Sequence, residues 1–340
     1  MRRNRMSGWS RAALLLAVGS GLVAGGTAAP ASAAGPGSAQ GQRHNTAHTT
    51  GQHAWHSRGH GEGPHQRWQH GRDHQHRSWH HGRDRSFDYA ALGDSYAAGY
   101  GGGAVRDACG RTAEGYPALL DGLDGVALVS NQSCAGATAL STPPGPPEGP
   151  VDLPEQIEAL AAGGLIGRGT DLLTVTIGGN DVRFGAVVAA CAGPELPATC
   201  APALEAAQAY AETTLAAQLR ESLGRLRSLA PRAEIVLTGY PHLFEEGTPG
   251  PLSPQAQALF NEGTDKLNAV LAAQLGRGST FVDVVDEFSG HGVGSPEPWI
   301  IFDGGPFDLH PNATGYRDGY LAAFTADVEL PSHGGCRGRS

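Results

Sequence analysis

The sequence predicts a three-layer α/β/α fold around a central, mostly parallel sheet of five strands. From Phe87 onward, short apolar runs alternate with longer stretches rich in Ala and Leu. This order is typical of strands that are each followed by a helix covering a parallel sheet. Three of the expected strands also end in small polar residues, and ligands of open parallel sheets bind at the carboxyl ends of the strands. We therefore expect a single α/β domain over residues 87–330, with a site at that edge.

The expected strands are short segments that end near turn residues. They are FDYAALGDS from Phe87, VALVSNQSC from Val126, DLLTVTIGGND from Asp171, AEIVLTGYP from Ala233 and TFVDVV from Thr280. Small polar clusters follow the first three of them. Because these ends would meet at one edge of the sheet, the clusters are the first candidates for a site.

The expected helices lie between the strands and after the last one. The segment 153–163 has Pro154 in its first turn and glycines after its end, the usual asymmetry of a helix. The run 201–230 is long, amphipathic and rich in helix-forming residues. The segment 253–276 starts with Ser253 as an N-cap and Pro254 at the first helical position. A final helix is expected after Asn312.

The N-terminus predicts a secretory signal peptide over residues 1–33, and hence a secreted protein. Four arginines precede an uncharged run over residues 12–26, and Ala31-Ser32-Ala33 is a small-x-small cleavage site. The apolar run is shorter than the roughly 20 residues that span a bilayer, so a retained anchor is the weaker alternative. No later segment is long and apolar enough to span, and we expect no stable membrane insertion.

Residues 34–86 and 331–340 predict disordered tails. The first tail contains 11 of the 15 histidines, with Arg, Gly and Gln and almost no aliphatic residue except Ala. Such a segment cannot bury a core. The alternative is a segment that binds metal or associates with the cell wall. Its irregular histidine spacing does not match a tetrahedral metal site.

The remaining chain is acidic. Residues 87–340 contain 13 basic and 30 acidic side chains, a net charge of −17, against −9 for the whole sequence. Such a surface repels polyanions, so nucleic acid is not an expected partner. We expect a monomer whose partner is a small-molecule or lipid substrate.

Five cysteines in a chain with an export signal predict disulfides rather than a metal site. Cys191 and Cys200 would close a short loop, and Cys109 and Cys134 a longer one. Each bridge would contribute about 2–4 kcal/mol. Cys336 would be left over, and the sequence alone does not determine the pairing.

Ser95, in the turn Gly93-Asp94-Ser95, is either an ordinary turn residue or a nucleophile. A serine hydroxyl becomes a good nucleophile only when a nearby base takes its proton. Outside the histidine-rich tail over residues 34–86, the candidate bases are His242, His291, His310 and, in the C-terminal tail, His333. His310 is the strongest, because Pro311 and the helix that follows would hold it in one orientation.

Four short blocks follow one another along residues 87–330. They are LGDSYAAGYG with Ser95, SCAGAT with Gly136, TIGGND with Asn180 and HPNATGY with His310. Each block alone is usually a turn, because Gly and Asn tolerate unusual backbone angles. Together they resemble the GDSL-type, or SGNH, hydrolase family, and most closely its secreted, disulfide-bearing esterase and lipase branch.

The resemblance implies a role for each of the four residues. Ser95 Oγ would attack an ester carbonyl after His310 accepts its proton. The main-chain N–H groups of Ser95 and Gly136 and the side-chain amide of Asn180 would form the oxyanion hole. This chemistry requires no cofactor, and no residue cluster has the spacing of a metal site.

One position departs from the family pattern. The residue three before the histidine is commonly an aspartate that orients its ring, and here it is Phe307. The expected substitute is the main-chain carbonyl of Phe307. The alternatives are the carboxylates of Asp308, two residues before the histidine, and of Asp303.

We therefore expect a secreted serine esterase or lipase that hydrolyses carboxylic esters through an acyl-enzyme. The Pro-rich segment 141–150 and the loop from Gly193 to Ala201 are expected to shape its acyl pocket. One alternative is an acetylesterase that deacetylates a polysaccharide. The alternative from another class is a non-catalytic protein that binds metal or the cell wall through its histidine-rich tail.

Overall fold

The computed structural model describes residues 86–140 and 151–331, whose strands form one parallel sheet. The sheet order is β2-β1-β3-β4-β5, and every neighbouring pair is parallel. The strands are β1 (Phe87–Gly93), β2 (Val126–Asn131), β3 (Leu172–Thr176), β4 (Glu234–Thr238) and β5 (Ser279–Val282). The predicted five-stranded sheet is thereby confirmed. The predicted signal peptide, both tails, Cys336 and the segment 141–150 lie outside the described residues.

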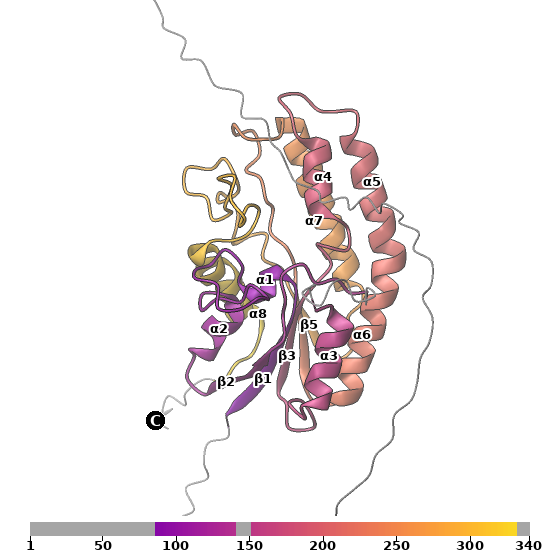
Figure 1. The fold of residues 1–340 in the computed structure, drawn as a ribbon, viewed down its shortest axis with the longest axis vertical. Helices are drawn as coiled ribbons and strands as arrows, with labels where there is room; N and C mark the ends of the chain where they lie inside the picture. The colour runs from indigo at the N-terminus through magenta and orange to yellow at the C-terminus, as the bar shows by residue number, and fades with distance from the viewer. Residues whose placement is uncertain (1–85, 141–150, 332–340) are drawn as a thin grey trace, which may run out of the picture. The chain divides into compact units, whose positions relative to one another are not determined.

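Helices cover both faces of this sheet, as predicted. One face is covered by α2 (Tyr116–Asp121), η2 (Gly315–Leu321) and α8 (Ala322–Asp327), with the short α1 (Ser95–Ala98) at the end of β1. The other is covered by α3 (Leu153–Ala162), α6 (Ala216–Leu229) and α7 (Pro254–Ala272). Figure 1 shows α3 and α6 on one side of the strands and α2 and α8 on the other. Beside α7 stand α4 (Phe184–Cys191), α5 (Cys200–Tyr210) and the π-helical turn η1 (Ala211–Leu215).

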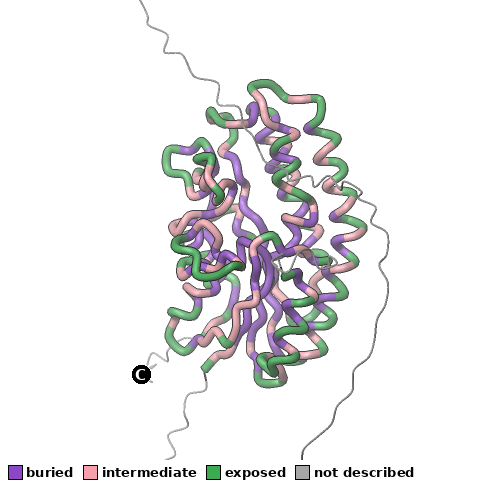
Figure 2. The backbone as a smooth tube through the Cα atoms, viewed as in Figure 1, coloured by how far each residue is buried: buried purple, intermediate pink, exposed green. Residues whose placement is uncertain are grey.

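The sheet forms the centre of the core. The burial colours follow this arrangement, with the central strands β1, β3 and β4 mostly buried, the edge strands β2 and β5 only partly buried, and the outward faces of the helices exposed (Figure 2). All five residues of β3 are buried, and β1 is buried from Tyr89 to Gly93. Continuous apolar strands of this kind are typical of a parallel sheet with both faces covered. Within residues 86–140 and 151–331, no helix combines the length and apolarity needed to cross a membrane.

The register of the two central strands brings two of the predicted blocks together. β1 and β3 pair from Tyr89–Leu172 to Gly93–Thr176, so both strands end at the same level. The hydrogen bond from Asp94 N to Thr176 O (2.9 Å) continues the pairing by one step. The chain after β1, which carries Ser95, and the chain after β3, which carries Asn180, therefore leave the sheet side by side.

The helices were predicted less completely than the strands. α3, α7 and the last helix lie where expected, and Ser253 caps α7 by accepting a hydrogen bond from Ala256 N. The predicted run 201–230 consists of α5, η1 and α6. The sequence did not predict α1, α2 or α4. Of these, α2 and α4 have no side-chain N-cap, and α4 begins after Arg183 in a left-handed conformation, so its start carries no recognisable signal.

Candidate active site

Ser95 lies in a sharp turn between β1 and α1. Gly93 has a φ of +129°, and a Cβ there would lie 2.1 Å from the carbonyl oxygen of Thr176, so only glycine fits. Asp94 is the N-cap of α1 and accepts a hydrogen bond from Tyr96 N at 2.9 Å. Ser95 is 5% exposed. The turn thus presents one hydroxyl at the carboxyl edge of the sheet.

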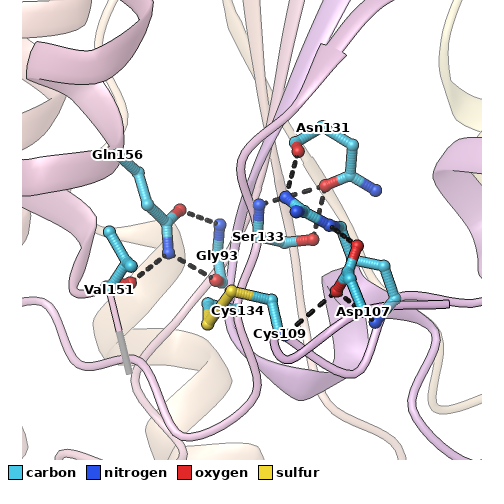
Figure 3. The surroundings of a disulfide bond; sticks show 9 residues. Gly93, Asp107, Cys109, Asn131, Ser133, Cys134, Val151 and Gln156 are labelled. Carbon is cyan, nitrogen blue, oxygen red and sulfur yellow. Dashed lines mark hydrogen bonds and ion pairs between the residues drawn. A yellow bond between two sulfur atoms is a disulfide. The ribbon is translucent and has the colours of Figure 1, made fainter. Parts of the chain in front are cut away.

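Gln156, a buried residue of α3, holds the main chain of Gly93, where this turn begins. Its Oε1 accepts from Gly93 N at 2.7 Å, and its Nε2 donates to Gly93 O at 2.9 Å and to Val151 O at 2.7 Å (Figure 3). The sequence analysis missed Gln156. The available signal was a polar residue on a helix face otherwise formed by buried leucine and isoleucine.

Tyr240, two residues after β4, connects the turn Gly93-Asp94-Ser95, called the nucleophile turn below, to the chain after β3. Its hydroxyl donates to Asp94 Oδ2 at 2.5 Å and accepts from Gly179 N at 2.9 Å. Burial raises the pKa of the Asp94 carboxyl to about 7. Asp94 thus has a partner in its own turn, Tyr96 N, and a distant one, Tyr240, which the sequence did not predict.

The structure brings His310 to Ser95. Nε2 of the imidazole lies 2.8 Å from Ser95 Oγ, although the two residues are 215 positions apart. Nδ1 lies 2.9 Å from the main-chain oxygen of Asp308. A carbonyl can only accept, so Nδ1 carries the proton and donates it to that bond. Nε2 is then unprotonated and accepts from the serine hydroxyl.

The group that orients His310 is not the one preferred from the sequence. The oxygen of Phe307 accepts from the main-chain N–H of His310 at 3.2 Å, whereas the ring bonds the oxygen of Asp308. The two carboxylates considered as alternatives serve the loop itself. Asp308 accepts from the N–H groups of Asp303 and Gly304, and Asp303 from that of Gly305. The 2.9 Å bond of the ring is therefore to the main-chain carbonyl one residue later than predicted, while the Phe307 carbonyl also acts on the imidazole and raises its pKa.

The histidine turn contains a left-handed residue that is not glycine. Leu309 has a φ of +66°, an uncommon conformation for a bulky side chain. Three hydrogen bonds hold it. Tyr96 Oη donates to Leu309 O at 2.5 Å, Leu309 N donates to Ile301 O at 2.7 Å, and Ile301 N donates to His310 O at 2.9 Å. This reversal of the chain directly precedes the imidazole.

Aromatic side chains surround the imidazole. The ring centroids of Tyr96, Tyr100 and Phe184 lie 5.3, 5.1 and 6.5 Å from that of His310. Burial among them lowers the pKa of His310 below its ordinary value of 6.5, and the Asp308 carbonyl partly opposes this. The ring is therefore neutral at pH 7, as a general base must be.

Gly136 and Asn180 lie beside the nucleophile turn. Cys134 N donates to Gly93 O at 2.9 Å, and Asn180 Nδ2 donates to Ala137 O at 2.9 Å. Gly136, with a φ of +88°, lies between these two anchored residues. In the described parts of the chain, the main-chain N–H groups of Ser95 and Gly136 donate to no protein acceptor. The three donors implied by the resemblance thus belong to neighbouring segments.

Further bonds restrain the segment that carries Gly136. The Cys109–Cys134 disulfide joins it to the loop after α1 (Figure 3). Ala135 N also donates to Cys109 O at 2.8 Å. Asp181 accepts from Ala139 N at 3.0 Å, and burial raises its pKa to about 6. The second disulfide, Cys191–Cys200, links α4 to α5.

The other histidines have different partners. His242 Nε2 pairs with Asp265 Oδ1 at 2.7 Å. The ring of His291 stacks on Trp299 with centroids 3.7 Å apart. His333 lies outside the described residues. Among the histidines that the structure describes, His310 alone contacts Ser95.

Comparisons with known proteins agree with this geometry. Residues 91–317 match the model of the GDSL-like lipase/acylhydrolase family. A lipase of Streptomyces rimosus is 34% identical over 242 residues, covering 69% of this chain and 84% of that lipase. Lipase 1 of Streptomyces coelicolor is 31% identical, covering 68% and 84%.

Two solved structures show the same fold. The extracellular lipase of S. rimosus matches with a TM-score of 0.61 and 31% identity, over 72% of this chain and all of that one. Phospholipase A1 of Streptomyces albidoflavus matches with a TM-score of 0.59 and 27% identity, over the same shares.

Proposed function

This chain belongs to the GDSL-like lipase/acylhydrolase family and hydrolyses carboxylic esters, and we propose that Ser95 is its nucleophile and His310 its general base. The observation that carries the proposal is the 2.8 Å contact between Ser95 Oγ and His310 Nε2. The tautomer set by the Asp308 carbonyl supports it, because only an unprotonated Nε2 can accept the hydroxyl proton.

Acylation follows from this arrangement. Ser95 Oγ bonds to the carbonyl carbon of the ester while its proton passes to His310 Nε2, and the carbonyl oxygen becomes an oxyanion. His310 then gives that proton to the departing alkoxide, which leaves as the alcohol. The acyl group remains on Ser95 as an ester.

Deacylation repeats these steps with water. His310 takes a proton from a water molecule, whose oxygen attacks the acyl carbon, and then returns the proton to Ser95 Oγ. The products are the free acid and the regenerated enzyme. Protein groups suffice for every proton transfer in this cycle.

The oxyanion requires donors that are already oriented. We assign this role to the N–H groups of Ser95 and Gly136 and to the side-chain amide of Asn180. One amide hydrogen of Asn180 is bonded to Ala137 O, which leaves the other for the substrate. Removal of one such donor typically costs about 10²–10³ in kcat.

Paired substitutions test the assignment. Ser95→Ala and His310→Ala should each lower the kcat for p-nitrophenyl acetate by about 10⁶, and the double variant should be no worse, because the two residues act as a unit. His242→Ala is the matched control and should keep full activity. Undiminished turnover in Ser95→Ala, or losses that add in the double variant, would refute the assignment.

We also propose that the protein is secreted. The arginine-rich start, the apolar run and the Ala31-Ser32-Ala33 site support this, as do the two disulfides and the extracellular lipase among its relatives. The full chain expressed in a bacterial host should be recovered from the medium with its N-terminus at Ala34. Retention in the cytoplasm with an intact N-terminus would contradict this.

A further inference from the structure

One side chain connects the nucleophile turn to the histidine turn. Tyr96 follows Ser95 directly in α1, and its hydroxyl donates to the main-chain oxygen of Leu309 at 2.5 Å. Because Leu309 precedes His310, a single hydrogen bond joins the residue after the nucleophile to the residue before the base. Tyr96 is 3% exposed, and burial raises the pKa of its hydroxyl above the ordinary 10. The hydroxyl therefore keeps its proton and acts as a donor.

The carbonyl that Tyr96 bonds belongs to the peptide group between Leu309 and His310. Within the residues that the structure describes, no main-chain N–H donates to this oxygen, so the tyrosine hydroxyl is its donor. The N–H of the same peptide donates to Phe307 O over a longer distance, 3.2 Å. Ile301 pairs with the N–H before this peptide and with the carbonyl after it, but with neither of its own polar groups. The orientation of this peptide therefore depends on Tyr96.

The backbone at this peptide needs contacts to keep its conformation. Leu309 has a φ of +66°, and the left-handed region is unfavourable for a residue with a Cβ. A rotation about the main-chain bonds of Leu309 would move the imidazole of His310 relative to Ser95 Oγ and to Asp308 O. These are the two atoms that its nitrogens contact, at 2.8 and 2.9 Å. A bond that prevents this rotation therefore keeps the base in place.

The ring of Tyr96 is itself held firmly. Its centroid lies 5.1 Å from that of Tyr240, in an edge-on contact, and 6.1 Å from that of Tyr320. It also lies 5.3 Å from the centroid of the His310 ring. The main-chain N–H of Tyr96 donates to Asp94 at 2.9 Å. The hydroxyl thus extends from a packed ring on a bonded main chain, the kind of support that holds a group within a narrow range of positions.

We infer that Tyr96 is a positioning residue for ester hydrolysis, and that its hydroxyl holds the Leu309–His310 peptide so that the imidazole faces Ser95 Oγ. The inference rests on the proposed roles of Ser95 and His310. Because the hydroxyl acts through the base and not on the substrate, its loss should lower kcat and leave KM unchanged. The loss should be smaller than that of Ser95 or His310, since Ile301 still holds the rest of the histidine turn.

The test is Tyr96→Phe, which removes the hydroxyl and keeps the ring. The kcat for p-nitrophenyl acetate should fall about fivefold with KM unchanged, because one hydrogen bond of the histidine turn is lost. In the proton NMR spectrum, the Nδ1–H resonance of His310 should move upfield or broaden, because its bond to Asp308 O loosens. A 4-aminophenylalanine at position 96 retains a donor and should restore the resonance and most of kcat.

Tyr89→Phe is the matched control. Tyr89 is a buried tyrosine of β1 whose hydroxyl also donates to a main-chain carbonyl, that of Pro117 in α2. It should keep the wild-type kcat and the His310 resonance.

Three results would overturn the inference. They are an unchanged kcat in Tyr96→Phe, a lower kcat with an unchanged resonance or without repair by 4-aminophenylalanine, and an equal loss of kcat in Tyr89→Phe. Failure of the proposed function is distinct, because it would appear as acetate hydrolysis by Ser95→Ala.

Discussion

The nucleophile turn and the histidine turn meet at one hydrogen bond, but different parts of the chain hold them. Buried side chains from other elements fix the nucleophile turn: Gln156 of α3 bonds Gly93, and Tyr240 after β4 bonds Asp94. Main-chain groups hold most of the histidine turn. The carbonyl of Asp308 orients the ring, and Ile301 pairs with residues 309 and 310.

This difference indicates where the site is sensitive to substitution. A peptide group held by a side chain loses its partner when that side chain changes, and a buried group left unpaired costs about 1–3 kcal/mol. A ring held by a main-chain carbonyl keeps its partner under most substitutions. Ser95 should therefore be easily displaced by changes at distant residues, and His310 should tolerate changes at its neighbours other than Tyr96.

Among the residues that support the two turns, Gln156→Leu should have the largest effect. It leaves Gly93 N without its partner, which lowers the free energy of unfolding by about 1–3 kcal/mol, whereas Gly93 O keeps its hydrogen bond from Cys134 N. Displacement of Ser95 should also lower kcat, by up to about 10². Denaturant unfolding and steady-state kinetics measure the two effects separately.

Gln257→Leu is its matched control. Gln257 is equally buried on α7, and its side chain bonds main-chain groups of Gly247, Thr248 and Leu252 rather than groups of the site. It should lower stability to a similar extent and leave the kcat of the folded enzyme unchanged. Equal losses of kcat in both variants would show that Gln156 acts through stability alone.

Tyr240→Phe should have the next largest effect. It removes the hydroxyl that joins Asp94 to Gly179 N, and it raises the pKa of Asp94 further, because the tyrosine hydrogen bond opposes the effect of burial. We expect kcat to fall about tenfold, equivalent to roughly 1.4 kcal/mol of lost positioning, with KM unchanged.

Tyr320→Phe provides the comparison for this change. Tyr320 is also a buried tyrosine, and its hydroxyl donates to Gly239 O, not to Asp94. It should leave kcat close to that of the wild type. A higher KM with an unchanged kcat in Tyr240→Phe would mean that the tyrosine contributes to substrate binding instead.

Asp308→Asn should have a small effect on turnover. Its carboxylate caps Asp303 and Gly304, while its main-chain oxygen, which the substitution retains, orients His310. We expect kcat to fall by less than about tenfold. In enzymes where an aspartate carboxylate orients the histidine, the same substitution lowers kcat by about 10⁴. A loss of several orders of magnitude would show that the carboxylate orients the ring in the working enzyme.

The pH dependence should show the smallest change. Burial lowers the pKa of His310, and the base works only when neutral, so kcat/KM should fall with decreasing pH only below 6.5. Tyr100→Ala exposes the ring and should raise the pKa of His310 toward 6.5. The pH below which kcat/KM falls, the acid limb of the profile, should rise with it. A limb that starts above 6.5 in the wild type would contradict the burial argument.

The sequence predicted the sheet and the residues that meet at its edge, because both depend on local patterns. Apolar runs between turn residues predict buried strands, and the blocks containing Ser95, Asn180 and His310 each follow a strand or precede a helix. Parallel pairing then brings them together, as the register of β1 with β3 shows. The catalytic roles that we propose for them rest on the family resemblance and the geometry.

The partners of these residues could not be predicted in the same way. Gln156 and Tyr240 act across gaps of 63 and 146 residues, and nothing in their local sequence identifies the group that each bonds. The carbonyl that faces His310 depends on the left-handed turn at Leu309, a conformation that leucine rarely adopts. The helix α4 lacks a start signal, so the wall it forms beside Ser95 was missed.

Covalent labelling tests the central claim most directly. The wild-type protein should react with a fluorophosphonate probe, and mass spectrometry of the digested adduct should find the phosphonyl group on Ser95 alone. His310→Ala should react far more slowly, because the hydroxyl has lost its base. An adduct on another residue, or labelling at Ser95 that is as fast without His310, would contradict the account.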